Sequence, residues 1–148
     1  MSEWLTVMFG AYPKFVKHLF EGFDHSKVGF SKAALFVMIV LKYRRKEKGL
    51  KMSELEHHAG LKKSTLSEAV DGLVKDGYVH RERSEEDRRV VKVKLTEKGM
   101  KKTDEITEKI KDYVNERLAF LSNAERKRLF KAFEEIENVA ERLKESGK

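Results

Sequence analysis

The sequence contains no cysteine, and this absence removes several classes of function. Among its 148 residues there is no thiolate nucleophile, no cysteine ligand for zinc or an iron–sulfur cluster, and no thiol redox switch. Nothing in the composition indicates an oxidising compartment. A chain of this length suits one domain, with or without an assembly arm. It can bury about 68–70% of the surface that its unfolded form exposes, so it needs no disulfide to fold.

Long hydrophobic runs are also absent. The longest uncharged apolar run extends from Ala33 to Leu41, which is too short to cross a hydrocarbon core about 30 Å thick. The N-terminus carries Glu3 before its apolar residues and lacks the basic start and the small-residue cleavage site of a signal peptide. The sequence therefore predicts a cytoplasmic protein.

The recurrent short motifs of enzymes are missing as well. The chain has no glycine-rich phosphate loop, no Gly-x-Ser-x-Gly elbow and no metalloprotease helix. His57 and His58 are neighbours on an expected helix, where their side chains should point about 100° apart and away from any shared ion. We therefore expect neither an enzyme nor a metal or cofactor site.

Charge, in contrast, is abundant and uneven. Charged residues make up 39% of the chain, and the net charge is +7. The segment from Lys42 to Lys102 holds 18 lysines and arginines against 11 aspartates and glutamates, while the remainder holds 14 of each sign. The whole surplus therefore lies in one central segment. A solvated surface would spread both signs evenly, so the localised excess favours a polyanionic partner.

Apolar residues near the N-terminus predict a helix with one buried stripe. Pro13 lies within the pattern and either starts the helix proper or kinks it. The residues at three- and four-residue spacing are Leu5, Met8, Tyr12, Phe15, Val16, Leu19, Phe20 and Phe23.

A second helix is expected from Ser31 to about Lys46. Ser31 is a good N-cap, and Gly49 ends the helix. The expected inward residues are Leu35, Met38, Ile39 and Tyr43.

Two short helices separated by Gly60 then form a helix-turn-helix signature. Ser53 and Glu56 have the spacing of a capping box that opens the first helix, over residues 53–58. Thr65 and Glu68 repeat that spacing before the second helix, which we expect to be the recognition helix. Its inward stripe should consist of Leu66, Val70, Leu73 and Val74, until Gly77.

After Gly77 the hydrophobic period changes from helical to alternating. Residues 78–83 are predicted as one strand, 84–89 as a charged turn and 90–95 as a second strand. Val91, Val93 and Leu95 alternate with lysines, which places the lysines on the opposite face. The sequence therefore predicts a β-hairpin with a basic tip.

Two long helices are expected after the hairpin. Thr96 caps the first, and Ser122 with Glu125 forms a capping box that opens the second. The expected inward residues are Ile106, Ile110, Tyr113, Val114, Leu118 and Leu121 on the first helix and Leu129, Phe133, Ile136, Ala140 and Leu143 on the second.

The helices at both ends of the chain are not needed to fold its centre, because a helix-turn-helix with a hairpin wing can fold in about seventy residues. They either thicken one core or pack against a second copy, and their apolar residues favour an isologous twofold interface. The predicted fold is mainly α with a small β-hairpin. We expect a winged helix-turn-helix DNA-binding domain over residues 31–99 and a helical dimerisation region over residues 1–30 and 100–148.

The wing carries the most specific family likeness. Asp87-Arg88-Arg89, followed after five residues by Leu95-Thr96-Glu97-Lys98-Gly99, resembles the wing signature of the MarR family of winged-helix transcriptional regulators. That signature is an Asp-x-Arg turn before a strand that ends in Leu-Thr-x-x-Gly. Upstream, the segments that are similar to the family's recognition helix and wing entry are Ser64-Thr65-Leu66, Val70-Asp71-Gly72-Leu73 and Gly77-Tyr78-Val79. The likeness covers residues 53–99, and outside them it depends on helix order alone.

The resemblance implies a homodimer that binds pseudo-palindromic duplex DNA, usually as a repressor. It also implies that a small-molecule effector, phenolic or otherwise aromatic, releases the protein from the DNA. Such a dimer would place two recognition helices in successive major grooves about 34–36 Å apart, each with a basic wing at the adjacent minor groove. A non-specific architectural or chromatin protein and a winged-helix module for protein contacts are the alternatives. Five side chains either line an effector pocket or belong to the core: Trp4, Tyr12, Phe15, His18 and Tyr43.

Nine residues are candidate DNA contacts: Lys62, Lys63, Ser64, Thr65 and Ser67 at the recognition helix, and Arg83, Arg88, Arg89 and Lys92 on the wing. Short hydroxyl side chains near a helix N-terminus suit close approach to phosphates and bases, and lysines supply counterion release. By family likeness, Asp87 would brace the wing by pairing with a nearby arginine, and Arg89 would reach the minor groove. Thr65 and Glu68 also suit helix capping alone, so a DNA contact by Glu68 stays open.

Overall fold

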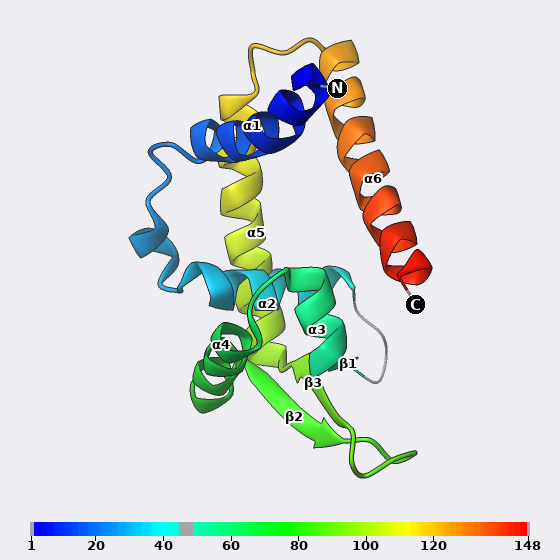
Figure 1. Ribbon diagram of the computed structural model, residues 1–148. Helices are drawn as coiled ribbons and strands as arrows, with labels where there is room; N and C mark the ends of the chain where they lie inside the picture. The colour runs from blue at the N-terminus through cyan, green and yellow to red at the C-terminus, as the bar shows by residue number, and fades with distance from the viewer. Residues whose placement is uncertain (1, 45–48, 148) are drawn as a thin grey trace. The chain divides into compact units, whose positions relative to one another are not determined.

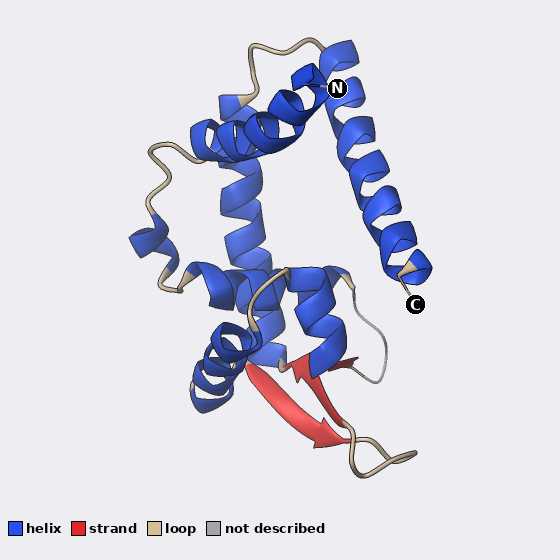
Figure 2. Ribbon diagram, viewed as in Figure 1, coloured by secondary structure: helices blue, strands red, loops and turns tan. Residues whose placement is uncertain are grey.

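The computed structural model describes residues 2–44 and 49–147. Figure 1 shows the elements in chain order, and Figure 2 separates the helices from the strands. None of the described helices has the length and hydropathy needed to span a bilayer. The elements are α1 (Ser2–Leu19), the 3₁₀ turn η1 (His25–Val28), α2 (Lys32–Tyr43), β1 (Leu50–Lys51), α3 (Met52–Ala59), α4 (Lys63–Lys75), β2 (Val79–Arg83), β3 (Val91–Leu95), α5 (Glu97–Arg117) and α6 (Asn123–Ser146).

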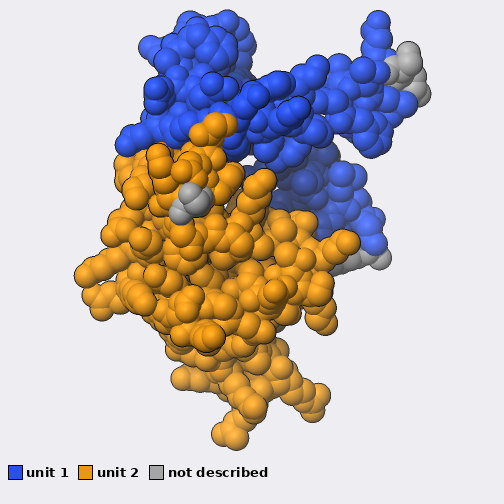
Figure 3. Space-filling view, turned by 90° about the vertical axis from the view of Figure 1, so that its left-hand side faces the viewer, with its two compact units in different colours: residues 1–21, 112–148 blue, residues 22–111 orange. Residues whose placement is uncertain are grey.

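The chain forms two compact units, which Figure 3 shows in different colours. The terminal unit consists of residues 1–21 and 112–148 and contains α1, the end of α5 and α6. The central unit consists of residues 22–111 and contains the elements from η1 to the first part of α5. The expected helix-turn-helix and wing thus lie together in the central unit.

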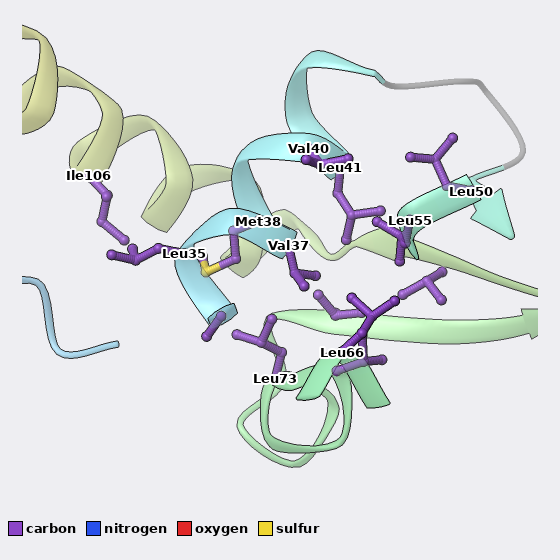
Figure 4. Close-up of a cluster of buried hydrophobic side chains, with 14 of the residues drawn as sticks. Leu35, Val37, Met38, Val40, Leu41, Leu50, Leu55, Leu66, Leu73 and Ile106 are labelled. Carbon is purple, nitrogen blue, oxygen red and sulfur yellow. The ribbon is translucent and has the colours of Figure 1, made fainter. Parts of the chain in front are cut away.

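A single hydrophobic cluster holds the central unit together (Figure 4). Val37 and Met38 on α2 are completely buried, and they pack with Leu55 of α3 and Leu66 of α4. Ile106 extends the cluster to α5. Fully burying one such side chain stabilises a fold by about 1.5–3 kcal/mol, so this cluster fixes how the short helices and the wing are arranged.

The sheet contains one strand that the sequence did not predict. The strand order is β1-β3-β2, antiparallel throughout, with Val93 of β3 opposite Leu50 on one side and Arg81 on the other. Gly49 precedes β1 with a φ of +78°, and a Cβ there would lie 2.8 Å from the Val93 carbonyl oxygen. A strand of two residues is too short to show an alternating pattern in the sequence. In the structure it is marked by the close approach of Gly49 to the Val93 carbonyl. The predicted hairpin of β2 and β3 is confirmed.

The predicted opening of α3 is wrong. The helix begins at Met52, and the backbone N–H of Lys51 donates to the Glu54 carboxylate at 2.8 Å. Ser53 and Glu56 therefore form no capping box. The chain enters α3 directly from β1, so the turn starts earlier and Glu54 is the acid that reaches back. The turn at Gly60 is confirmed, with a φ of +60°.

The predicted capping box at α4 is also wrong. The helix begins at Lys63 after the N-cap Lys62, whose side chain makes no capping hydrogen bond. Thr65 and Glu68 therefore lie inside the helix and do not cap it. The buried stripe is confirmed, since Leu66, Val70 and Leu73 are each at most 2% exposed.

The capping predictions at the two long helices are confirmed. At α5 the Gly99 N–H donates to Thr96 Oγ1 at 3.0 Å. At α6 the two residues of the capping box bond to each other: the Glu125 N–H donates to Ser122 Oγ at 3.2 Å, and the Ser122 N–H donates to the Glu125 carboxylate at 2.7 Å. These hydrogen bonds lower the pKa of the Glu125 carboxyl below its usual value. At the other end of the chain, α1 continues through Pro13.

Aromatic contacts join the helices of the terminal unit. The Phe133 ring on α6 lies 5.3 Å from that of Phe15 and 6.5 Å from that of Tyr12, both on α1. The Tyr113 hydroxyl donates to the Glu21 carbonyl at 2.6 Å. These contacts use only part of the apolar surface of α1 and α6.

Several residues that were predicted to face inward are exposed. On α1, Leu5 is 41%, Met8 45% and Tyr12 57% exposed, and on α2 the Tyr43 side chain is 64% exposed. The described part of α6 has no buried residue, although its apolar residues recur at helical spacing. Helical spacing of apolar residues therefore did not predict burial at these positions.

Candidate nucleic-acid interface

The N-terminal end of α4 presents a polar, cationic surface. Lys62, Lys63, Ser64 and Thr65 are exposed, while Ser67 is half-buried. The opposite side of the helix is the stripe packed into the core. Because the core fixes that side, the remaining side is the one that a partner can reach. The free N–H groups of the first turn add partial positive charge to the same end.

The wing tip is a turn stabilised by its own backbone. The Ser84 N–H donates to the Val90 carbonyl at 2.9 Å, and the Val90 N–H donates to the Asp87 carbonyl at 3.0 Å. The Asp87 carboxylate accepts the N–H of Arg89 at 3.0 Å. In the described chain no arginine pairs with Asp87, so its contact within the turn is with backbone and not with a guanidinium.

Three arginines of the wing lie at its tip or beside it. Arg83, Arg88 and Arg89 are exposed, and within residues 2–44 and 49–147 none of the three forms an ion pair; Lys92 is half-buried. Lower on the hairpin, Glu82 lies 2.7 Å from His80 Nε2 and 3.2 Å from Lys94 Nζ. Hydrogen bonds from His80 and Lys94 hold the pKa of the Glu82 carboxyl below its usual value. Glu82 is thus paired lower on the hairpin, while the tip carries three exposed acids, Glu85, Glu86 and Asp87, beside its arginines.

One ion pair joins the recognition helix to the wing. The Arg81 guanidinium on β2 donates to the Asp71 carboxylate on α4. No sequence pattern predicts this pair, because the partners are ten residues apart on different elements and no periodicity links them. The pair connects the two elements whose relative position would determine how they meet a duplex.

We expect Asp71→Ala to lower the free energy of unfolding by about 0.2–1 kcal/mol, because both partners are partly exposed and water screens their attraction. Urea denaturation of Asp71→Ala, Arg81→Ala and the double variant would give the coupling energy. Lys75→Ala, also exposed on α4, is the matched control. A coupling energy of zero between Asp71 and Arg81 would contradict the ion pair.

The two adjacent histidines lie closer together than expected. The ring centroids of His57 and His58 are 5.1 Å apart with their planes tilted by 58°. The prediction that these neighbours cannot face one ion together is wrong, since rotation about the side-chain bonds brings their ring nitrogens within 4.8 Å of each other. Both histidines lie on α3, which precedes the recognition helix α4 in the chain.

The central unit is a helix-turn-helix followed by an antiparallel wing, and cations lie at the recognition helix and at the wing tip. This arrangement is typical of winged-helix DNA-binding regulators. The family model described as "Transcriptional regulator SarA/Rot" matches residues 20–106. The chain therefore belongs to the SarA/Rot family of transcriptional regulators.

The chain is also similar to individual transcriptional regulators. The HTH-type transcriptional repressor YetL of Bacillus subtilis is 33% identical over 64 residues, which is 43% of this chain and only 38% of YetL. The transcriptional regulator BldR of Sulfolobus solfataricus superposes with a TM-score of 0.76 at 25% identity, over 92% of this chain and 95% of BldR. A MarR-family regulator of Silicibacter pomeroyi superposes with a TM-score of 0.66 at 23% identity, over 92% of this chain and 87% of that regulator. The predicted likeness to MarR-family regulators and the predicted fold class are confirmed.

Proposed function

We propose that the chain is a cytoplasmic, homodimeric repressor that binds pseudo-palindromic double-stranded DNA. The recognition helix α4 enters the major groove, and the wing tip lies at the adjacent minor groove. The observation that carries the proposal is that one compact unit presents cations on both elements, Lys62 and Lys63 at α4 and Arg88 and Arg89 at the wing. Neutralising phosphates with such side chains releases counterions and favours binding to a polyanion.

The individual contacts follow from side-chain chemistry. Ser64 and Thr65 lie in the first turn of α4, where short hydroxyls and free N–H groups suit phosphate oxygens and base edges. Ser67 and Lys92 are half-buried and would contact DNA only with their outer atoms. Arg83 extends the cationic surface from the wing tip along β2. We assign Asp87 the role of holding the tip turn in shape, through the N–H of Arg89.

The dimer is supported by the uncovered apolar surface of the terminal unit. On α6 the Phe133 ring packs against α1, but Ile136, Val139 and Leu143 are 57%, 42% and 65% exposed. On α1, Trp4 and Phe9 are 63% and 72% exposed. Soluble monomers rarely expose large apolar patches, and a twofold interface between two copies would cover these side chains. We therefore propose residues 1–30 and 100–148 as the dimerisation region.

An aromatic effector is the second part of the proposal. Within the terminal unit, a groove of about 470 Å³ is lined by apolar side chains, among them Phe15 and Phe120, by the cations Lys14 and Arg117, and by His18. Such a lining suits a planar apolar compound with an acidic or phenolic group. Titration of phenolic and benzoic compounds into the protein–DNA complex tests this part, and release of DNA by none of them would contradict it.

Footprinting on the DNA upstream of the protein's own coding sequence is the decisive experiment for the proposed function. We expect two protected half-sites about one helical turn apart, and binding about 10³-fold or more tighter than to random duplex. Equal affinity for every duplex would indicate an architectural protein. A failure to bind any duplex at moderate salt would indicate a module for protein contacts.

Replacing Arg89 with alanine should weaken operator binding by about 1–3 kcal/mol, because the side chain is exposed at the wing tip and has no ion pair within the described residues. Fluorescence anisotropy with a labelled operator measures the change. Arg128→Ala, which removes an exposed arginine from α6, is the control and should bind normally. Unchanged affinity of the Arg89 variant would remove this residue from the interface.

A further inference from the structure

Glu68 is an exposed acid in the middle of the recognition helix. It lies in the second turn of α4, three residues after Thr65 and four before Gly72, so the three residues share one side of the helix. All three are exposed. A Cβ at Gly72 would meet nothing within 4 Å, so no packing contact within the chain requires a glycine there. This side of α4 is low in bulk and lets another molecule approach the helix closely.

The structure removes the roles within the chain that Glu68 was suited to. It does not cap α4, because the helix begins at Lys63, five residues earlier. Within the described residues it forms no hydrogen bond or ion pair, whereas Asp71 pairs with Arg81 and Glu82 with His80 and Lys94. Glu68 is thus the one acid on α4 and β2, among described residues, whose charge is uncompensated.

An uncompensated carboxylate is costly on a surface that meets phosphates. At about 0.1 M salt the screening length is about 10 Å, so a charge on the groove-facing helix still feels the DNA backbone. The repulsion is offset where the carboxylate accepts a hydrogen bond. A carboxylate is an acceptor with no donor of its own. In the major groove, cytosine presents its amino group at N4 as a donor, and an acid on a recognition helix is a suitable partner for it.

We propose that Glu68 is a specificity-determining residue whose carboxylate accepts a hydrogen bond from the amino group of one cytosine in each half-site. The inference rests on the proposed function, because it requires α4 to lie in the major groove. Glu68 selects a C·G pair at one fixed position, and it lowers affinity for every duplex that lacks that pair. The residue therefore contributes to discrimination more than to affinity.

The test is selection of bound duplexes from a randomised library with the full-length protein and three variants. Glu68→Ala removes the acceptor and the charge, and Glu68→Gln keeps the shape while adding a donor that suits adenine. Glu108→Ala is the matched control, because it removes an exposed acid from α5 and leaves α4 intact. Melting temperatures of all four proteins show whether each variant is folded.

The unchanged protein is expected to select cytosine at one position of each half-site, by about tenfold over the other bases. Glu68→Ala should lose that preference alone and bind random duplex more tightly, Glu68→Gln should shift the preference to adenine, and Glu108→Ala should select as the unchanged protein does. An unchanged preference at every position in both folded Glu68 variants overturns the inference and leaves the proposed function standing. If the unchanged protein selects no sequence at all, the proposed function fails and the inference fails with it.

Discussion

Replacing Gly99 with alanine is expected to lower the free energy of unfolding by about 3 kcal/mol, the upper end of what overpacking costs. A Cβ at this position would lie 1.9 Å from the Tyr78 carbonyl oxygen and 3.2 Å from Leu95 Cδ2. That carbonyl cannot move freely, because it also accepts the N–H of Thr96 at 3.0 Å. Gly99 itself is buried at the start of α5. The start of α5 and the entry to the wing must therefore separate.

Urea denaturation followed by circular dichroism measures this loss. Gly72→Ala is the matched control, because it is also a helical glycine but has open space where the Cβ would lie. It should raise stability by about 1 kcal/mol, the difference in helix propensity between the two residues. A Gly99→Ala protein as stable as the unchanged chain would show that the wing and α5 are not packed as described here.

The second large effect is expected from Ile136→Asp on α6. Ile136 lies at the centre of the exposed apolar face, between Val139 and Leu143 on one side and Phe133 on the other. A carboxylate in a dimer interface would be desolvated without a partner, so we expect the variant to sediment as a monomer of 17.3 kDa. Operator affinity should then fall about 10²-fold or more, because two linked half-site contacts become one.

Lys131→Asp is the control for this variant. It introduces the same side chain into the same helix, on the polar face opposite Ile136, and should leave both the dimer and operator binding intact. Analytical ultracentrifugation of the two variants and the unchanged chain gives the comparison. If the unchanged chain sediments as a monomer, or if Ile136→Asp remains a dimer, α6 is not the proposed interface.

The position of the candidate interface was predictable because its signals are local. The buried stripe of α4, the turn at Gly60 and the strand β3 each depend on residues within one element or turn, and the structure confirms all three. The two capping boxes were not predictable in the same way. Several polar residues near a helix start satisfy the Ser/Thr-x-x-Glu spacing, and neighbouring structure decides which of them is used. At α3 the preceding strand β1 determines that Glu54 and not Glu56 bonds back to the helix start, and at α4 no side chain caps the helix.

The sequence by itself determined the helix order, the hairpin, the core side of α4 and the location of the positive charge, because periodicity and composition act over a few neighbouring residues. Tertiary structure alone decided the rest. It paired Asp71 with Arg81, left Glu68 without a partner among the described residues, and placed Gly99 against the Tyr78 carbonyl. It also left Leu5 and Tyr43 exposed, although their spacing predicted burial. Periodicity identifies an apolar face, but only the neighbours that reach it in space determine whether it is covered.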